Sequence, residues 1–214
     1  MSNARKLADN LPTDGQLSGR NVIINGAMNV SQRTTSATGL GGGSGYYTVD
    51  RYKTQTVGTT AGRYTMEQAG ITDLAGFHNC IKLSCTTADT SIGGSESLLF
   101  RQIIEGQDLQ RFAKGTSDAK EFTVSFYVKG NANATYTCEL FDSDNSRQIS
   151  KTFSVTTSWT RVILTFPADT TGAFTDDNGV SLYVTIWLVA GPNYSSGTLN
   201  SSAWASQTTT NRAS

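Results

Sequence analysis

Four carboxylates are the residues that could carry acid–base chemistry in this sequence. Glycoside hydrolases use a pair of Asp or Glu side chains, and the two members of the pair can come from distant strands. The candidates are Glu96, Glu105, Glu139 and Asp142, and no spacing selects two of them. The only histidine, His78, lies in no motif that resembles a nucleophile elbow or a hydrolytic triad. The sequence therefore favours a protein that is not an enzyme.

Two acidic loops carry the oxygen ligands that a hard cation such as Ca²⁺ prefers. One loop holds Asp142, Asp144 and Asn145, and the other spans residues 176–178. Neither loop has EF-hand spacing, and Asx-rich hairpin turns use the same residue types without a metal. A structural Ca²⁺ at Asp142, Asp144 and Asn145 is the candidate metal site. We expect no other cofactor.

The three cysteines do not form a metal or disulfide pattern. Cys80 and Cys85 are five positions apart, which places them on opposite faces of one strand, so they are not expected to bridge each other. Together with Cys138 and His78 they lack the spacings of a zinc site. The sequence predicts three buried free thiols.

Aromatic and polar side chains alternate with the apolar row on several predicted strands, which suggests carbohydrate recognition. Aromatic rings stack on the apolar faces of sugars, and polar groups bond their hydroxyls. The candidate glycan-binding residues are Tyr127, Glu139, Tyr183 and Trp187. The alternative is that these aromatic residues pack against loops, an N-terminal arm or a neighbouring subunit.

The elements that must position these residues are strands. Apolar residues alternate most clearly over residues 122–128, 136–140 and 180–188. With 31 threonines and 23 serines the composition favours strands and turns over helix, and only residues 108–114 look helical. Short strands separated by turn clusters indicate an all-β fold. We expect an antiparallel jelly-roll β-sandwich with a short N-terminal arm and at most one short helix.

The two ends of the chain differ from the predicted sandwich, which spans residues 20–214. Residues 1–19 are read as an extended arm, with a disordered tail as the alternative. Residues 197–214 contain little apolar material beyond Leu199, Ala203 and Trp204, so they cannot readily supply a buried strand. A sandwich lacking its last strand exposes an unpaired edge. We expect either a natural chain longer than this one or a neighbouring subunit that pairs with the edge.

Charge and hydropathy exclude several partners. The 17 basic residues equal the 17 acidic ones, whereas a nucleic-acid interface needs a clustered basic excess. No polybasic segment favours an anionic membrane, and no apolar run is long enough to span a bilayer or to form a signal peptide. The sequence predicts a soluble protein made in the cytoplasm, which reaches the outside only if assembled particles are released by lysis.

Several motifs spread over residues 20–212 resemble structural proteins of marine and other environmental bacteriophages. The matching segments are residues 20–33 (RNVIINGAMNVSQR), 46–51 (YYTVDR), 100–112 (FRQIIEGQDLQRF), 124–130 (VSFYVKG), 147–151 (RQISK), 169–174 (DTTGAF) and 194–204 (YSSGTLNSSAW). The family has a jelly-roll domain similar to carbohydrate-binding modules. Two departures stand out: Tyr127 takes the place of a frequent tryptophan, and the chain stops where relatives usually continue into another strand.

The resemblance implies a component of a virion appendage that meets the host surface. It implies other virion structural proteins as partners and a homo-oligomer, with a trimer favoured. The N-terminal arm resembles segments that dock small appendage proteins on a virion, which would give Arg5, Lys6, Leu7 and Leu11 a role in assembly.

The function that we predict is a non-enzymatic phage virion protein, a tail-fibre or tail-tip appendage that contributes to assembly and recognises host-surface glycans. The alternatives are a capsid or tail decoration protein without a ligand, and a carbohydrate-binding module of a secreted hydrolase.

Overall fold

The computed structural model describes residues 21–58 and 61–214, and these residues form an antiparallel all-β fold. The predicted N-terminal arm, with Arg5, Lys6, Leu7 and Leu11, lies outside the described residues. The strands in chain order are β1 (Ser36–Leu40), β2 (Tyr52–Val57), β3 (Arg63–Gly70), β4 (Asn79–Thr87), β5 (Ser97–Glu105), β6 (Phe122–Val128), β7 (Ala134–Asp142), β8 (Arg147–Val155), β9 (Thr160–Phe166), β10 (Val180–Ala190) and β11 (Ala205–Ser206).

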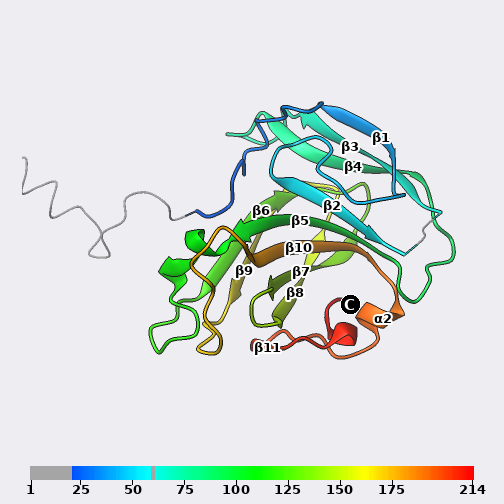
Figure 1. Ribbon diagram of the computed structural model, residues 1–214. Helices are drawn as coiled ribbons and strands as arrows, with labels where there is room; N and C mark the ends of the chain where they lie inside the picture. Colours follow the sequence, from blue (N-terminus) through cyan, green and yellow to red (C-terminus); the bar gives the residue numbers. More distant parts are fainter. Residues whose placement is uncertain (1–20, 59–60) are drawn as a thin grey trace, which may run out of the picture.

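The strands form three sheets in two layers (Figure 1). One layer is a six-stranded sheet in the order β11-β8-β7-β10-β5-β2, and the other layer combines the pair β6-β9 with the three-stranded sheet β1-β3-β4. The pairs β7–β8, β6–β9 and β5–β10 are nested along the chain and alternate between the two layers. This nesting is that of a jelly roll, so the predicted fold class is confirmed.

The main hydrophobic core lies between the six-stranded sheet and the β6–β9 pair. Leu140 and Leu182 point inward from the six-stranded sheet, and Phe122 and Phe166 from the facing pair. These residues belong to the alternating apolar rows seen in the sequence, because successive side chains of a strand point to opposite faces. The opposite face of the six-stranded sheet is therefore free to carry a different set of side chains.

A second core lies under the three-stranded sheet. It is built from Val49, Tyr52, Tyr64 and Met66. The Tyr52 ring stacks on Phe100 with centroids 5.2 Å apart, and burial raises the pKa of Tyr52 to about 12. This core joins β2, at the edge of the large sheet, to the β1-β3-β4 sheet.

Helical structure is short in the described part of the chain. The predicted helix at residues 108–114 is two 3-10 turns, Gly106–Asp108 and Gln110–Phe112. The one α-helical turn described is α2 (Pro192–Ser195), which follows β10 directly. Among the described residues, no helix is long and apolar enough to cross a membrane.

The C-terminal segment, which was not expected to supply a buried strand readily, supplies a short strand whose two residues are not buried. Ala205 and Ser206 form β11, which pairs antiparallel with the start of β8. Trp204 is buried in the main core, where its Nε1 donates a hydrogen bond to the Pro167 carbonyl at 2.9 Å. Trp204 and the two residues of β11 attach this polar segment to the sandwich. The same chain therefore covers part of the edge of β8.

The cysteines are free, but only one of the three is buried. Burial raises the pKa of the Cys138 thiol to about 12, so this side chain behaves as a small apolar core residue. Cys80 is half-buried and Cys85 is exposed on β4. The prediction of three buried thiols is wrong for these two, because β4 is an outer strand of the smaller sheet.

Candidate functional site

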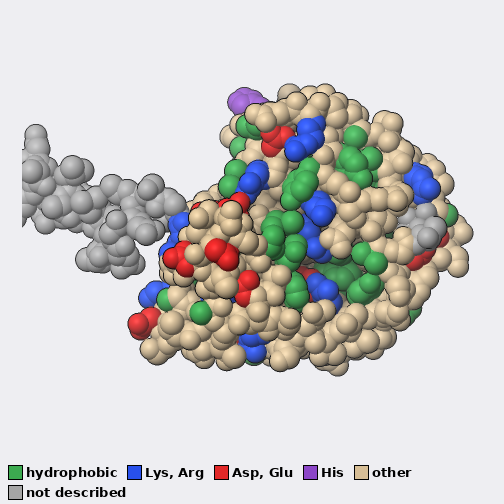
Figure 2. Space-filling model, viewed as in Figure 1, with side chains coloured by type: hydrophobic (Ala, Val, Ile, Leu, Met, Phe, Trp, Pro, Cys, Tyr) green, Lys and Arg blue, Asp and Glu red, His purple; other side chains and the backbone are tan. Residues whose placement is uncertain are grey.

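A cleft of about 270 Å³ lies on the face of the six-stranded sheet that points away from the main core. In Figure 2 the surface toward the viewer is hollowed over this sheet, and hydrophobic and basic side chains gather in the hollow. The cleft is lined by Gln55, Val57, Ser97, Leu99, Arg101, Phe141, Ser143, Tyr183, Trp187, Tyr194 and Arg212.

Strand register places these side chains in rows across the sheet. Tyr183 on β10 is opposite Phe141 on β7, and their rings lie 6.0 Å apart. In the next row Thr185 stands between Arg101 on β5 and Glu139 on β7. Because the side-chain period of a strand is two, each residue in these rows faces the cleft side of the sheet.

Glu139 lies fully buried at the floor of this face, where the C-terminal segment closes over it. Its carboxylate accepts two hydrogen bonds from Arg212, at 2.7 Å from Nε and 2.9 Å from Nη2. It also accepts a bond of 3.1 Å from Trp187 Nε1. Arg212 is anchored by its own backbone, since its carbonyl accepts a bond from the Ser150 hydroxyl. A bidentate ion pair thus holds the end of the chain against the sheet.

Trp187 is 4% exposed, and Arg212 and Tyr194 from the C-terminal region pack against its ring. The Arg212 guanidinium carbon lies 5.2 Å from the Trp187 ring centroid, and the Tyr194 ring lies 5.1 Å away. Ala213 packs in the same small cluster. Trp187 therefore forms a covered wall of the cleft, and its ring is not an open platform for a sugar.

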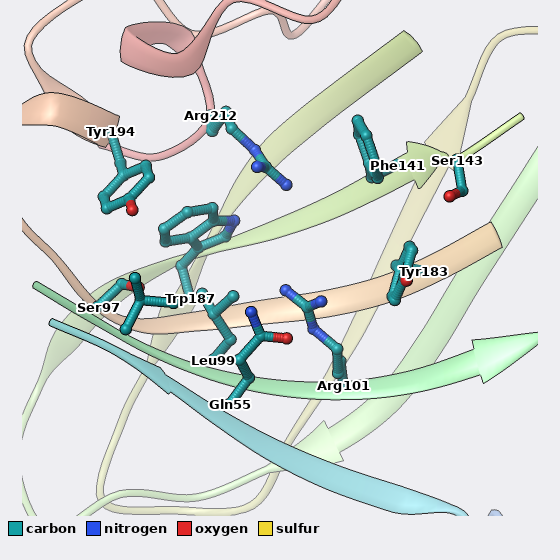
Figure 3. Close-up of a pocket in the computed structure, with 11 residues that line it drawn as sticks. Gln55, Ser97, Leu99, Arg101, Phe141, Ser143, Tyr183, Trp187, Tyr194 and Arg212 are labelled. Carbon is teal, nitrogen blue, oxygen red and sulfur yellow. The ribbon is translucent and has the colours of Figure 1, made fainter. Parts of the chain in front are cut away.

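Arg101 has a different environment from Arg212. Its side chain is 7% exposed, and its guanidinium lies 4.8 Å above the Tyr183 ring. Within residues 21–58 and 61–214 it forms no ion pair, and its Nε has no hydrogen-bond partner. Burial lowers the pKa of this guanidinium, although the nearby Glu139 carboxylate acts in the opposite direction. In Figure 3 Arg101 and Arg212 both point into the space between Trp187 and Tyr183.

The sequence-predicted glycan residues divide into two groups. Tyr183 and Trp187 line the cleft, and Glu139 lies beneath it. Tyr127 lies on β6 in the other layer, where its ring is 40% exposed and meets Phe77 edge-on. The structure therefore does not bring Tyr127 together with the other three, because β6 and β10 belong to different sheets.

Two arginines and a glutamine of the cleft were not predicted from the sequence. A charged residue inside the otherwise apolar stretch of β5 was the available signal for Arg101. Gln55 is one of several polar residues on β2, and a polar residue at this position is equally typical of a solvent-exposed strand face. Arg212 gave no signal, because its place depends on how the polar C-terminal segment folds back.

The predicted Ca²⁺ loop instead forms part of a buried ion-pair network. Asp142 is fully buried, and Lys114 donates to its Oδ2 at 2.5 Å while Asn145 donates to both carboxylate oxygens. Asp144 accepts hydrogen bonds from Thr175. The oxygens expected to hold a cation are thus engaged by protein donors. Among the described residues, no group of three or more His, Cys, Asp or Glu side chains could hold a metal ion.

Asp169 completes this network. Its carboxylate accepts bonds from Arg147 at 2.7 and 2.9 Å and lies 3.1 Å from Lys114 Nζ. Burial acts to raise the pKa of Asp169, but the hydrogen bonds from Arg147 and Lys114 outweigh it and hold this pKa below its ordinary value. Two cations and two carboxylates are therefore balanced inside the fold, which explains why these charges tolerate burial.

The carboxylates considered for acid–base chemistry lie apart from the cleft surface. Glu139 and Asp142 are held in buried ion pairs. Glu96 accepts a bond from a loop N–H, and Glu105 accepts one from a glutamine amide. None of the four lines the cleft. What the cleft offers is a surface of rings, amide, hydroxyl and guanidinium groups suited to binding.

Comparisons with models of protein families, with curated proteins and with solved structures found no match for this chain.

Proposed function

We propose that this protein is a non-enzymatic component of a bacteriophage virion appendage, and that it binds a host-surface glycan in the cleft of its six-stranded sheet. The observation that carries the binding part is the composition of the cleft. It combines aromatic rings with an amide, hydroxyls and guanidinium groups in one concave site. Pockets with apolar walls and a few convergent polar groups are the usual form of a small-ligand site.

The ring that supports a sugar contact best is Tyr183, which lies beside Phe141 on the neighbouring strand and carries the Arg101 guanidinium over one face. Tyr183 is half-buried and lies at the end of the cleft away from the C-terminal segment, whereas Trp187 is covered by that segment. Ser143 near Tyr183, together with Gln55 and Ser97 farther along the cleft, supplies donors and acceptors for sugar hydroxyls. The volume fits one or two sugar units better than a long chain, since ligand pockets usually start at about 300 Å³.

The virion part rests on the resemblance of the motifs over residues 20–212 to phage structural proteins. Particle assembly within a host cell would bring the protein to the outside on lysis. Mass spectrometry of purified particles, together with immunogold labelling of the appendages, tests this part separately from ligand binding. Detection of the chain only in the unassembled fraction would contradict it.

A glycan array, followed by titration calorimetry on the best ligand, tests the binding part. We expect Tyr183→Ala to weaken binding about fivefold or more, because a stacked ring is lost. The matched control is Tyr127→Ala, which removes the same side chain from the other layer and should leave affinity unchanged. Equal losses in both variants would contradict the cleft as the site, and the absence of any glycan ligand would favour a decoration protein without a ligand.

A further inference from the structure

We propose that the cleft selects an acidic glycan and that Arg101 binds the anionic group of the sugar, a carboxylate or a sulfate ester. This inference rests on the proposed function, because it names the class of ligand for the same cleft. It goes beyond that function in assigning the selectivity to one side chain. Four features of the structure support it: the missing partner of Arg101, the commitment of the nearest carboxylate, the charge of the cleft and its other unpartnered polar atoms.

Arg101 is a buried cation that has no counter-ion among residues 21–58 and 61–214. Taking a guanidinium out of water costs several kcal/mol unless a partner compensates. Lys114 and Arg212 have such partners in Asp142 and Glu139. Within the described part of the chain, the contact given for the Arg101 guanidinium is the face of the Tyr183 ring. An anionic group of a bound ligand would compensate the free energy that burial of this guanidinium costs.

Glu139, the carboxylate in the cross-strand row of Arg101, is already engaged in an ion pair with Arg212. Glu139 stands in the same cross-strand row as Arg101, with Thr185 between them. Its two oxygens accept three hydrogen bonds from Arg212 and Trp187. Glu139 therefore forms its ion pair with Arg212 and acts on Arg101 only through its charge, so the hydrogen-bond donors of Arg101 remain for a ligand.

The charge around the cleft follows from the same pairing. Two arginines and no carboxylate line it, and Glu139 beneath them compensates one of the two. Lys53 lies opposite Arg101 on the edge strand β2 and adds positive charge on that side. A cleft with an excess of one sign of charge concentrates ligands of the other sign.

Two further polar atoms of this region have no partner within the described part of the chain. They are the hydroxyls of Ser97, which lines the cleft, and of Thr185, which stands beside Arg101 in the same row. Buried hydroxyls without partners are uncommon in native proteins. Thr185 lies beside the Arg101 guanidinium in one cross-strand row, whereas Ser97 lies four residues away on β5, toward the other end of the cleft. A planar carboxylate or a sulfate suits this arrangement, because a guanidinium can donate two parallel hydrogen bonds to it.

The experiment compares matched pairs of oligosaccharides by calorimetry, with the full chain throughout. Each acidic oligosaccharide is paired with the same compound after carboxyl reduction, or after desulfation, so that the two arms distinguish carboxylate from sulfate. For the wild type we expect about tenfold or more tighter binding of the acidic member, the usual worth of a charge-assisted hydrogen bond. Equal affinity for both members in both arms would overturn the proposal.

The decisive variant is Arg101→Gln, with Arg161→Gln as the matched control. Arg161 is an exposed arginine on β9 in the other layer. We expect Arg101→Gln to bind both members of a pair as the wild type binds the neutral one, and Arg161→Gln to keep the full preference. An Arg101→Lys variant should keep part of the preference, because it retains the charge but not the bidentate geometry.

The outcomes separate this inference from the proposed function. If Tyr183→Ala weakens binding while Arg101→Gln keeps the preference for acid, the cleft binds glycans and the role of Arg101 is wrong. If no glycan binds the wild type, both are wrong. A fold check accompanies the titration: Arg101→Met should raise the melting temperature of the free protein or leave it unchanged, since it removes an unpaired buried charge. A clear fall would assign Arg101 to stability and overturn its role in the ligand site.

Discussion

At the scale of single residues, buried charge is the feature that distinguishes structural side chains from the candidate ligand-binding one. Asp142, Asp169 and Glu139 are each paired with a lysine or an arginine at hydrogen-bonding distance. Such pairs satisfy the hydrogen bonds that burial would otherwise leave unmade. Arg101 lacks a counter-ion of this kind, which makes it the residue whose role is best explained by something outside the chain.

The Asp169 network gives the fold an acid-sensitive contribution to stability. Because the pKa of Asp169 is held below its ordinary value in the folded protein, its contribution is complete above about pH 4, the ordinary Asp range. It is lost as the pH falls through the lower folded-state pKa. We therefore expect the free energy of unfolding, measured by urea titration, to fall below about pH 4, with a shallower fall in Asp169→Asn.

The control for this experiment is Asp176→Asn, which changes an exposed side chain in the neighbouring loop. It should retain the wild-type pH dependence. An acid profile of Asp169→Asn parallel to that of the wild type would show that the carboxylate is not the group responsible.

At the scale of elements, the polar C-terminal segment contacts both faces of the six-stranded sheet. It pairs with β8 through β11 and fills the core with Trp204, and then returns to the other face of the sheet with Arg212. Its strand is short, and its last residues are held by the ion pair with Glu139 and by backbone hydrogen bonds from Arg212 and Ala213 to the Tyr194 carbonyl. The shape of the cleft therefore depends on this pair.

A double-mutant cycle tests the pair. We expect Arg212→Ala to lower the free energy of unfolding by about 3 kcal/mol, because Glu139 is left buried without its counter-ion. Adding Glu139→Gln removes the unpaired charge, so the double variant should recover part of the loss. Urea denaturation of the four proteins measures the coupling. Additive losses would mean that the pair contributes no interaction energy to the folded state.

At the scale of the whole molecule, the exposed edges and faces of the sandwich raise the question of assembly. β11 covers only Arg147 and Gln148 of β8, and β2 forms the other edge of the large sheet. The proposed role in a phage appendage predicts a homo-oligomer. Partly covered edges are consistent with strand addition by a neighbouring subunit, although the edge of β8 no longer requires it.

Light scattering over a dilution series tests the assembly. We expect a mass several times the 22.9 kDa of one chain, with a trimer favoured, and a shift toward smaller species on dilution. Native mass spectrometry gives the same readout independently. A species of 22.9 kDa at every concentration would contradict the oligomer.

The sequence by itself determined the long regular strands such as β6, β7 and β10 and which of their residues share a face. Alternation along a strand is local, so Tyr183 and Trp187 could be assigned to one side of β10 from their spacing alone. The composition, rich in threonine and in turn residues, was sufficient to predict the all-β class, because residue propensities for strands and turns are also local. Sheet membership is not local, and Tyr127, on an equally regular strand, belongs to the other layer.

Only the tertiary structure decided which polar residues are exposed and what they contact. Lys114 meets Asp142 across 28 residues of chain, and Arg212 meets Glu139 across 73. No sequence pattern specifies such pairings, because they depend on how loops and a terminal segment close over the sheet. That closure covers Trp187, engages the oxygens of the predicted cation site in hydrogen bonds, and leaves Arg101 without an ion-pair partner in the part of the chain that the structure describes.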